Sequence, residues 1–286
     1  MQKNKTIFVT GATGNQGGAV LRYLVSNGFS VKALLRNPSS EAGKKLIHPN
    51  VEIIQGDLNN PSTYQQHLSQ VDGVFCNLSY KDGNDKELKQ GLHLVNYARE
   101  KQVKHFLYSS VIGCDANTGI PHWENKFKIE NHLKESGMDF TIIRPSSLYE
   151  NLQIPDVKKR ILKGKLVLPT NRDKQQQFIG ADDIGRISAI IFSDPGKYSG
   201  RTIILAAEQM DGGQMAAVLS KALGKTINYQ KLPMIITRLI LGKDLAKMFR
   251  WVNENDALFV KDIAVVRNEF PGMLSLEDWA KSRLAK

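Results

Sequence analysis

The segment TIFVTGATGNQGG, residues 6–18, joins a short apolar run to a loop rich in glycine. Gly11, Gly14 and Gly17 have the spacing GxxGxxG. In such a loop the first glycine makes the tight turn after a strand, the second lets backbone approach a pyrophosphate, and the third lets the next helix pack on the strand. The amino end of that helix offers N–H groups and a positive dipole to phosphates. We therefore predict a Rossmann-type unit that binds a dinucleotide, and the alternative is a glycine-rich turn without a ligand. The residues of this segment expected to bind the cofactor are Gly11, Thr13, Gly14, Asn15, Gln16 and Gly17.

Outward from this loop, apolar runs alternate with stretches of helical periodicity up to about residue 150, a rhythm typical of βαβ units and a parallel sheet. The runs lack strict alternation, which is expected of strands covered on both faces. Strands are expected at residues 6–10, 30–35, 51–55, 73–77, 105–109 and 140–144, and helices at 17–27, 61–69, 85–101 and 123–136. In the third helix the apolar positions are Leu88, Leu92, Val95 and Ala98. The predicted fold class is α/β, a doubly wound Rossmann sheet with a small C-terminal α/β region.

The rhythm becomes irregular after residue 151. We expect a Rossmann domain over residues 1–151 and a smaller region over 152–286, discontinuous with the Rossmann core and joined without a linker. Helices are expected there at 182–192, 212–223, 232–253 and 276–284. The third of them carries an apolar stripe that includes Leu239, Ile240 and Val252. We expect this stripe in the core, and an exposed stripe would instead indicate a homodimer or partner surface.

The composition is that of an ordinary globular protein, with 286 residues, 41% of them hydrophobic and 23% charged. The formal net charge of +11 raises the question of nucleic acid. The basic residues are scattered, and the one dense patch, at 158–165, is interrupted by apolar residues, so we do not expect specific nucleic-acid binding. A basic field also suits an anionic cofactor. Cys76 and Cys114 provide neither a disulfide framework nor a metal site, and Cys76 in its apolar run is expected to be a buried, inert thiol.

No stretch reaches the roughly 18 apolar residues of a membrane span. The amino end lacks the apolar segment and cleavage site of a signal peptide. We therefore expect a cytoplasmic protein without a membrane span.

The end of the second strand indicates which dinucleotide is bound. An NAD site usually has an acidic residue there, but this strand ends in Arg36, whose guanidinium suits a 2′-phosphate. We therefore predict NADP(H), and the alternative is a solvated surface arginine. After the third strand, Asp57 would contact the adenine amino group and Leu58 would cover the ring, unless Asp57 only organises its turn. Asn77, which ends the fourth strand, is a further cofactor-binding candidate.

Three further segments narrow the class of protein. They are PHWENK at 121–126, an Arg144-Pro145 pair followed by Tyr149-Glu150-Asn151-Leu152, and KDLAKMFRW at 243–251. Together with the glycine loop they resemble the NmrA-like family of atypical short-chain dehydrogenases/reductases over nearly the whole chain. The resemblance implies NADP(H) binding, with some members acting as regulators that report the NADPH/NADP ratio to a protein partner and others as reductases. It also implies that Tyr149 and Asn151 line the nicotinamide, unless their loop only packs the C-terminal region.

The resemblance leaves catalysis open. An ordinary short-chain dehydrogenase has Tyr-x-x-x-Lys on a helix and Ser at a preceding strand end. Here Lys126 and Ser109 are present, with Ser110 beside it, but His122 stands in place of the tyrosine. His122 is either an acid/base or a packing residue, and Lys126 is expected to hold the ribose. The favoured function is a redox sensor or regulator with little or no dehydrogenase activity. The alternatives are an NADPH-dependent reductase of a quinone, aldehyde or imine, and a scaffold that ignores nucleotide.

Overall fold

A computed structural model describes residues 5–80 and 83–284 of the chain. They form two compact units. The first runs to Asp115 and also takes in His122–Arg144 and Ala181–Ile203. The second takes in Ala116–Pro121, Pro145–Gly180 and the chain from Ile204. The two units alternate along the chain more often than a single division at residue 151 would give, because two later helices and the start of a later strand belong to the first unit.

The centre of the first unit is a seven-stranded sheet with the order β10-β6-β5-β4-β1-β2-β3. Adjacent strands from β3 to β6 pair in parallel. Its strands are β1 (Thr6–Val9), β2 (Ser30–Leu35), β3 (Val51–Gln55), β4 (Gly73–Asn77), β5 (His105–Ser109), β6 (Phe140–Pro145) and β10 (Arg201–Leu205). The first six confirm the predicted strands, and the parallel sheet confirms the predicted fold class. β10 was not predicted.

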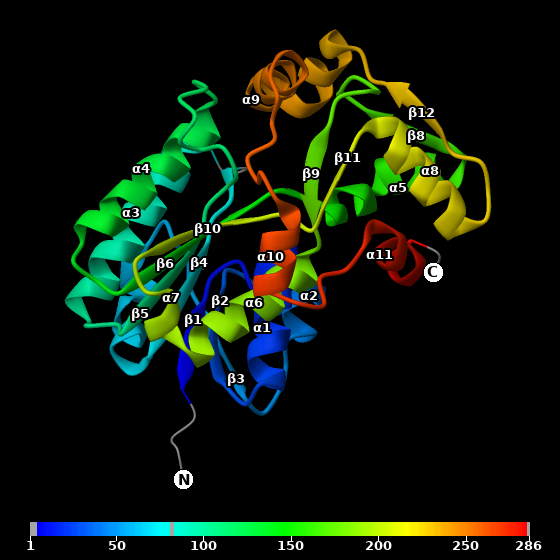
Figure 1. Ribbon diagram of the computed structural model, residues 1–286. Coiled ribbons are helices and arrows are strands. Elements are labelled where there is room, and N and C mark those ends of the chain that lie inside the picture. The colour runs from blue at the N-terminus through cyan, green and yellow to red at the C-terminus, as the bar shows by residue number, and fades with distance from the viewer. Residues whose placement is uncertain (1–4, 81–82, 285–286) are drawn as a thin grey trace. The chain divides into compact units, whose positions relative to one another are not determined.

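Helices cover both faces of this sheet (Figure 1). One face carries α1 (Asn15–Ser26), α6 (Ala181–Ser193) and the short α7 (Pro195–Tyr198), and the other carries α3 (Asn84–Glu100) and α4 (Pro121–Glu135). The short helix α2 (Glu41–Lys44) follows β2. The helix expected at 61–69 is replaced by two 3₁₀ segments, η1 (Pro61–Thr63) and η2 (Gln65–Gln70). They are separated at Tyr64, whose ring is fully buried in the core.

The second unit combines two small sheets with helices. One sheet has the order β11-β9-β7 and the other pairs β12 with β8. These strands are β7 (Ser147–Leu148), β8 (Lys165–Leu168), β9 (Gln176–Ile179), β11 (Glu208–Met210) and β12 (Asn228–Lys231). The helices are the 3₁₀ segment η4 (Tyr149–Gln153), α5 (Pro155–Leu162), α8 (Gly212–Leu223), α9 (Met234–Glu254), α10 (Ile263–Glu269) and α11 (Leu276–Arg283). Trp279 and Tyr149 lie in its apolar core.

The apolar stripe of α9 does not lie in the core as expected. Leu239 and Ile240 are 81% and 65% exposed, whereas Val252 is buried. Gly242 has φ 84° and ψ 176°, which is not helical. The two halves of α9 therefore do not share one continuous apolar face, and the sequence periodicity that spans Gly242 was misleading.

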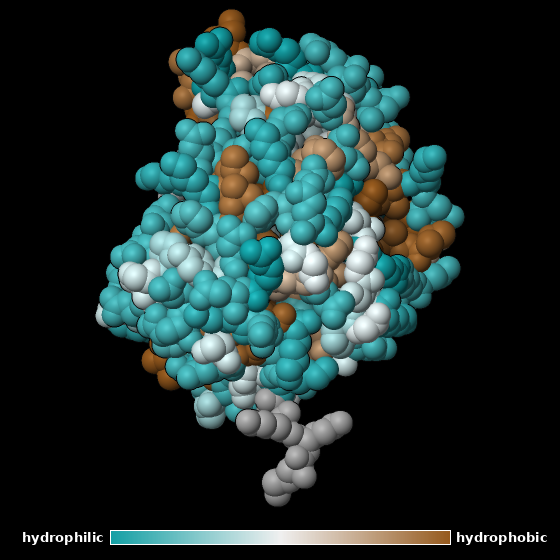
Figure 2. All heavy atoms as spheres, turned by 90° about the vertical axis from the view of Figure 1, so that its left-hand side faces the viewer, coloured by the Kyte–Doolittle hydropathy of each residue, from teal (hydrophilic) through white to brown (hydrophobic). Residues whose placement is uncertain are grey.

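Hydrophilic residues cover most of the face shown in Figure 2, with smaller apolar areas between them. Within the described residues, no helix is long and apolar enough to cross a membrane. The same part of the chain holds no cluster of three or more His, Cys, Asp or Glu residues placed to bind a metal ion.

Candidate functional site at the carboxyl edge of the sheet

The glycine loop has the backbone geometry that the sequence predicts. Gly11 turns the chain after β1 with φ +65°, a conformation that side chains disfavour. A Cβ atom at Gly17 would lie 2.3 Å from the Gly11 carbonyl oxygen, so only glycine fits there. Gly14 is the residue that precedes α1, and it brings no side chain to the amino end of that helix. The first N–H groups of α1 therefore receive no hydrogen bond from a capping side chain at this position.

The end of β4 holds the loop in place. The Thr10 hydroxyl donates to the Asn77 carbonyl at 2.9 Å and accepts from the Asn77 N–H at 2.8 Å. The side chain of Asn77 lies beside Gly11, where the Asn77 Nδ2 atom would be 3.1 Å from a Cβ atom. Asn77 is thus placed next to the loop, because β4 pairs directly with β1.

The end of β5 is joined to the same loop. The buried Ser109 hydroxyl donates to the Gln16 side-chain oxygen at 2.6 Å. Gln16 lies in the first turn of α1, two residues after Gly14. This contact brings together a residue predicted for catalysis and a residue predicted for cofactor binding.

The expected adenine end lies at the carboxyl ends of β2 and β3. Arg36 follows β2 directly and is exposed. The Asp57 carboxylate accepts from the Asn59 N–H at 2.8 Å and from the Asn59 side-chain amide at 3.0 Å. Asp57 therefore organises its own turn. Leu58 packs against the core of the first unit.

Lys126 forms a buried ion pair that the sequence analysis missed. Its ammonium lies 2.9 Å from a carboxylate oxygen of Glu87 on α3, and the two side chains are 9% and 0% exposed. The sequence does contain a pattern that indicates the burial of Glu87. Glu87 shares one helix face with Gly91, Leu94 and Ala98, at intervals of four, three and four residues. A charged residue on a buried face needs a partner.

His122 lies one turn before Lys126 and is almost fully buried. Its ring centre is 4.9 Å from that of Tyr80, with the ring planes tilted by 31°. Trp123 flanks it at 6.3 Å between ring centres, edge to face. The imidazole is therefore held among aromatic rings.

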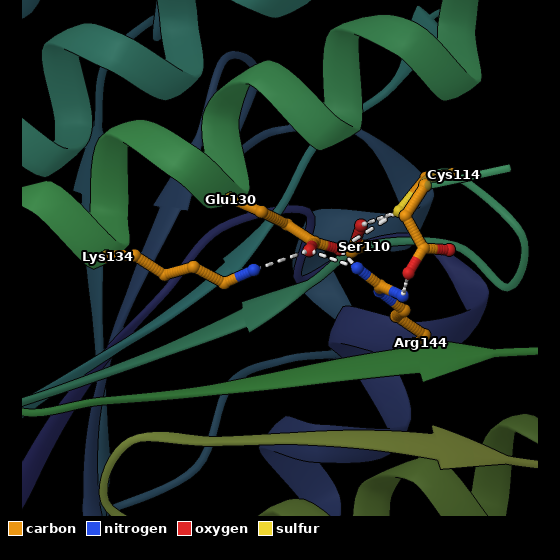
Figure 3. A network of polar contacts seen from close by, with 6 residues as sticks. Ser110, Cys114, Glu130, Lys134 and Arg144 are labelled. Atoms are coloured by element: carbon orange, nitrogen blue, oxygen red, sulfur yellow. Dashed lines mark hydrogen bonds and ion pairs between the residues drawn. The ribbon is translucent and has the colours of Figure 1, made fainter. Parts of the chain in front are cut away.

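A network of polar side chains fixes the loop that follows β5 (Figure 3). The Arg144 guanidinium donates to both carboxylate oxygens of Glu130, at 2.9 and 2.7 Å, and also donates to Asp115. The Cys114 thiol donates to Glu130 at 3.1 Å, and Lys134 lies 3.5 Å from the same carboxylate. Burial acts to raise the pKa of Glu130, but hydrogen bonds from its partners hold that pKa below the ordinary value. The network therefore contains a carboxylate shared between α4, β6 and the loop.

Both thiols are free and buried. Burial raises the pKa of Cys76 to about 12, and Cys76 is fully inaccessible. Burial also raises the pKa of Cys114 to about 12, and the neighbouring Glu130 carboxylate acts in the same direction. The thiolate, which is the nucleophilic form, is therefore disfavoured at both positions, and the burial of Cys76 agrees with the expectation for it.

Tyr149 and Asn151 belong to the second unit. Tyr149 is 1% exposed, its hydroxyl donates to Glu208 at 2.8 Å, and its ring centre lies 5.7 Å from that of Trp279. Asn151 is exposed. The Tyr149 side chain thus packs in the core of that unit, whereas the glycine loop, Ser109 and Lys126 belong to the first unit.

A pocket of about 330 Å³ is lined by residues that include Asn27, Arg186 and Tyr198. Asn27 is at the carboxyl end of α1, and the glycine loop is at its amino end. This pocket is therefore not the predicted nucleotide site.

The protein has a Rossmann-type α/β fold. This class is defined by the parallel sheet and by a glycine loop, at the carboxyl edge of the sheet, of the type that binds dinucleotides. The family model described as "NmrA-like family" matches residues 3–280. The chain is 31% identical over 253 residues to an NmrA-like family domain-containing oxidoreductase from a Cladobotryum species, which covers 78% of this chain and 75% of that protein. The chain belongs to the NmrA-like family.

Solved structures share the fold. The negative transcriptional regulator NmrA, in complex with NADP, superposes with a TM-score of 0.82 at 22% identity, covering 99% of this chain and 96% of that one. The NADPH-dependent quinone oxidoreductase QOR2 of Escherichia coli, in complex with NADPH, gives 0.81 at 22% identity, covering 98% and 100%. One neighbour is therefore a regulator and the other a reductase.

Proposed function

We propose that the chain binds NADP(H) at the carboxyl edge of its parallel sheet. The phosphates would lie at the Gly11–Gly17 loop and the amino end of α1, and Arg36 would face the 2′-phosphate. Ligands of open α/β sheets bind at this edge, and the loop has the required backbone geometry. Two structural neighbours were solved with NADP or NADPH, which supports the same choice of cofactor.

We further propose that the protein is a redox sensor or regulator with little or no dehydrogenase activity. The observation that carries this proposal is the buried pair of Lys126 and Glu87, 2.9 Å apart. In the ordinary mechanism a lysine lowers the pKa of a tyrosine acid, but here a carboxylate balances the ammonium charge and a histidine replaces the tyrosine. The imidazole of His122 is also shorter than a phenol and packs on Tyr80. The site thus lacks the activated tyrosine that donates the proton during hydride transfer in the ordinary mechanism.

In this proposal the protein is cytoplasmic, and nucleotide binding changes its affinity for a regulatory protein partner or for a second copy of itself. A ligand shifts such an equilibrium only through its differential affinity for the two states. The solved NmrA regulator is the structural precedent among the neighbours.

The second candidate is an NADPH-dependent reductase of a quinone, aldehyde or imine. The observation that favours it is the retention of Lys126 on α4 and of the Ser109 hydroxyl at the end of β5. The oxidoreductase relative and the quinone oxidoreductase neighbour belong to that class.

A two-stage experiment separates the candidates. NADPH is first titrated by fluorescence, and the complex is then screened with quinones, aldehydes and imines. The sensor proposal expects saturable binding, turnover far below about 1 s⁻¹, and a change in hydrogen exchange or self-association when NADPH is added. Turnover of about 1 s⁻¹ or more that is lost in both His122→Ala and Lys126→Ala, without a nucleotide-dependent change in exchange, would establish the reductase instead.

A further inference from the structure

We propose that Glu87 sets the relative affinity of the site for NADP⁺ and NADPH by balancing the charge of Lys126. This inference rests on the proposed nucleotide binding and concerns the redox state that the site prefers. Glu87 would act as a positioning and charge-balancing residue, without contact with the cofactor.

The packing of α3 on α4 fixes the pair. The Asn125 side chain donates to the Asn84 carbonyl at 2.8 Å, next to the ion pair. About one turn further along each helix, a Cβ atom at Gly91 would lie 2.5 Å from Ile129 Cδ1. Contacts on both sides therefore hold the Lys126 ammonium against the Glu87 carboxylate.

The pair lies near the strand ends that carry the proposed site. The Lys126 ammonium is 5.8 Å from the centre of the Tyr108 ring. Tyr108 immediately precedes Ser109, whose hydroxyl bonds to Gln16 of the loop region. Cys76 on β4 is the register partner of Tyr108, and it immediately precedes Asn77, whose side chain lies beside Gly11. The Lys126 ammonium thus lies beside β5, and the residues that follow Tyr108 and its neighbour Cys76 are those that meet the glycine loop region.

The charge of the pair distinguishes the two forms of the cofactor. The nicotinamide ring carries a positive charge in NADP⁺ and none in NADPH. A lone buried ammonium near the ring would disfavour NADP⁺, because buried charges are weakly screened by salt. Glu87 has no solvent exposure and brings the sum of the pair to zero. With the Glu87 carboxylate present, the site would therefore keep its affinity for NADP⁺. A sensor of the NADPH/NADP⁺ ratio must bind that oxidised form.

The test compares dissociation constants for NADPH, by fluorescence, and for NADP⁺, by calorimetry, in matched variants. Glu87→Gln removes the charge and keeps the shape. We expect the ratio Kd(NADP⁺)/Kd(NADPH) to rise by about tenfold. Lys126→Met should lower the same ratio, and the double variant should return it toward the wild-type value. Glu100→Gln removes an exposed carboxylate at the other end of α3 and should leave the ratio unchanged.

A structural role alone would weaken both affinities together, so the ratio is the informative quantity. An unchanged ratio in Glu87→Gln, with wild-type protein that binds both forms, would overturn this inference and leave the proposed function intact. Wild-type protein that binds neither form would overturn the proposed function itself. If Glu87→Gln does not fold, Lys126→Met tests the opposite sign, and a ratio that fails to fall there would also refute the inference.

Discussion

Gly91 on α3 and Ile129 on α4 approach so closely that a Cβ atom on Gly91 would come within 2.5 Å of the Ile129 side chain. Ile129 is fully buried, so its side chain has little room to move. The contact brings the backbones of the two helices together one turn away from Glu87 and Lys126. The close approach of α3 and α4 beside the ion pair thus depends on the absence of a side chain at Gly91.

Gly91→Ala is expected to destabilise the fold by about 1–3 kcal/mol, because an extra methyl group in a packed core forces its neighbours to shift. Helix propensity alone would make the alanine variant more stable than the wild type, so the expected loss of stability has the opposite sign. Urea unfolding measures the change. Gly196→Ala on α7, whose added Cβ atom would meet nothing closer than 4.0 Å, is the matched control and should be neutral or slightly stabilising. Equal stability of the two variants would contradict the close packing.

Gly14→Val is expected to abolish NADPH binding without unfolding the chain. An added Cβ atom at Gly14 would lie 3.3 Å from the Gly11 carbonyl oxygen, a contact that a small shift relieves, and the backbone φ of −92° suits a side chain. The branched side chain would instead occupy the space expected for the pyrophosphate. Circular dichroism and NADPH titration decide the outcome, with Gly196→Val as the control. Normal affinity in folded Gly14→Val protein would show that the loop is not the phosphate site.

Arg36→Ala is expected to weaken NADPH binding by about tenfold to a hundredfold and to leave NADH binding nearly unchanged, because a charge-assisted contact to phosphate contributes about 1.5–3 kcal/mol. Both affinities are measured by titration. Arg99→Ala removes the same charge from an exposed position near the end of α3 and should have no comparable effect. Equal affinities of the wild type for NADPH and NADH would refute the choice of cofactor.

His105 makes stability depend on pH. Burial lowers the pKa of His105 from 6.5 to about 4, and the ring Nε2 lies 3.0 Å from the Thr141 hydroxyl. The folded pKa is below the unfolded one, so the contribution of neutral His105 is fully present above pH 6.5 and is lost as the pH falls toward 4.

Between about pH 7 and pH 5, this residue should account for a loss of about 2 kcal/mol in the free energy of unfolding. Urea unfolding at the two pH values measures the loss. His105→Gln retains a donor to Thr141 but does not titrate. Its free energy of unfolding should therefore fall by about 2 kcal/mol less than that of the wild type between the two pH values. His93→Gln, at an exposed position of α3, should behave as the wild type. The same pH dependence in His105→Gln and wild type would rule out His105 as the source.

The six parallel strands of the first unit could be predicted to within one residue at each end. Most of them are covered on both faces and are rich in apolar residues, whereas the edge strand β3 keeps Glu52 and Gln55 exposed. The strands of the second unit have two to four residues, and partners distant in the sequence decide their pairing. Such short runs carry little periodicity, so they were not predicted.

The glycine loop and Arg36 follow from local sequence because each is placed by the strand before it. The burial of Glu87 could not be predicted in this way, because the apolar positions Leu88 and Leu92 indicated a different helix face, which is only partly buried. The face that meets α4 is instead selected by Gly91, through a contact between helices that are far apart in the sequence.

The position of β10 at the edge of the sheet beside β6 bears on how the chain is made. During synthesis β6 emerges long before Arg201–Leu205, and its outer edge has no strand partner until those residues leave the ribosome. Unpaired strand edges template aggregation, and incompletely paired sheets are the vulnerable species in the folding of larger chains. A fragment that stops before residue 201 would keep that edge open permanently. An autonomous nucleotide-binding fragment therefore has to include residues 181–205, and the part of them that belongs to the first unit, Ala181–Ile203, is flanked in the sequence on both sides by the second unit.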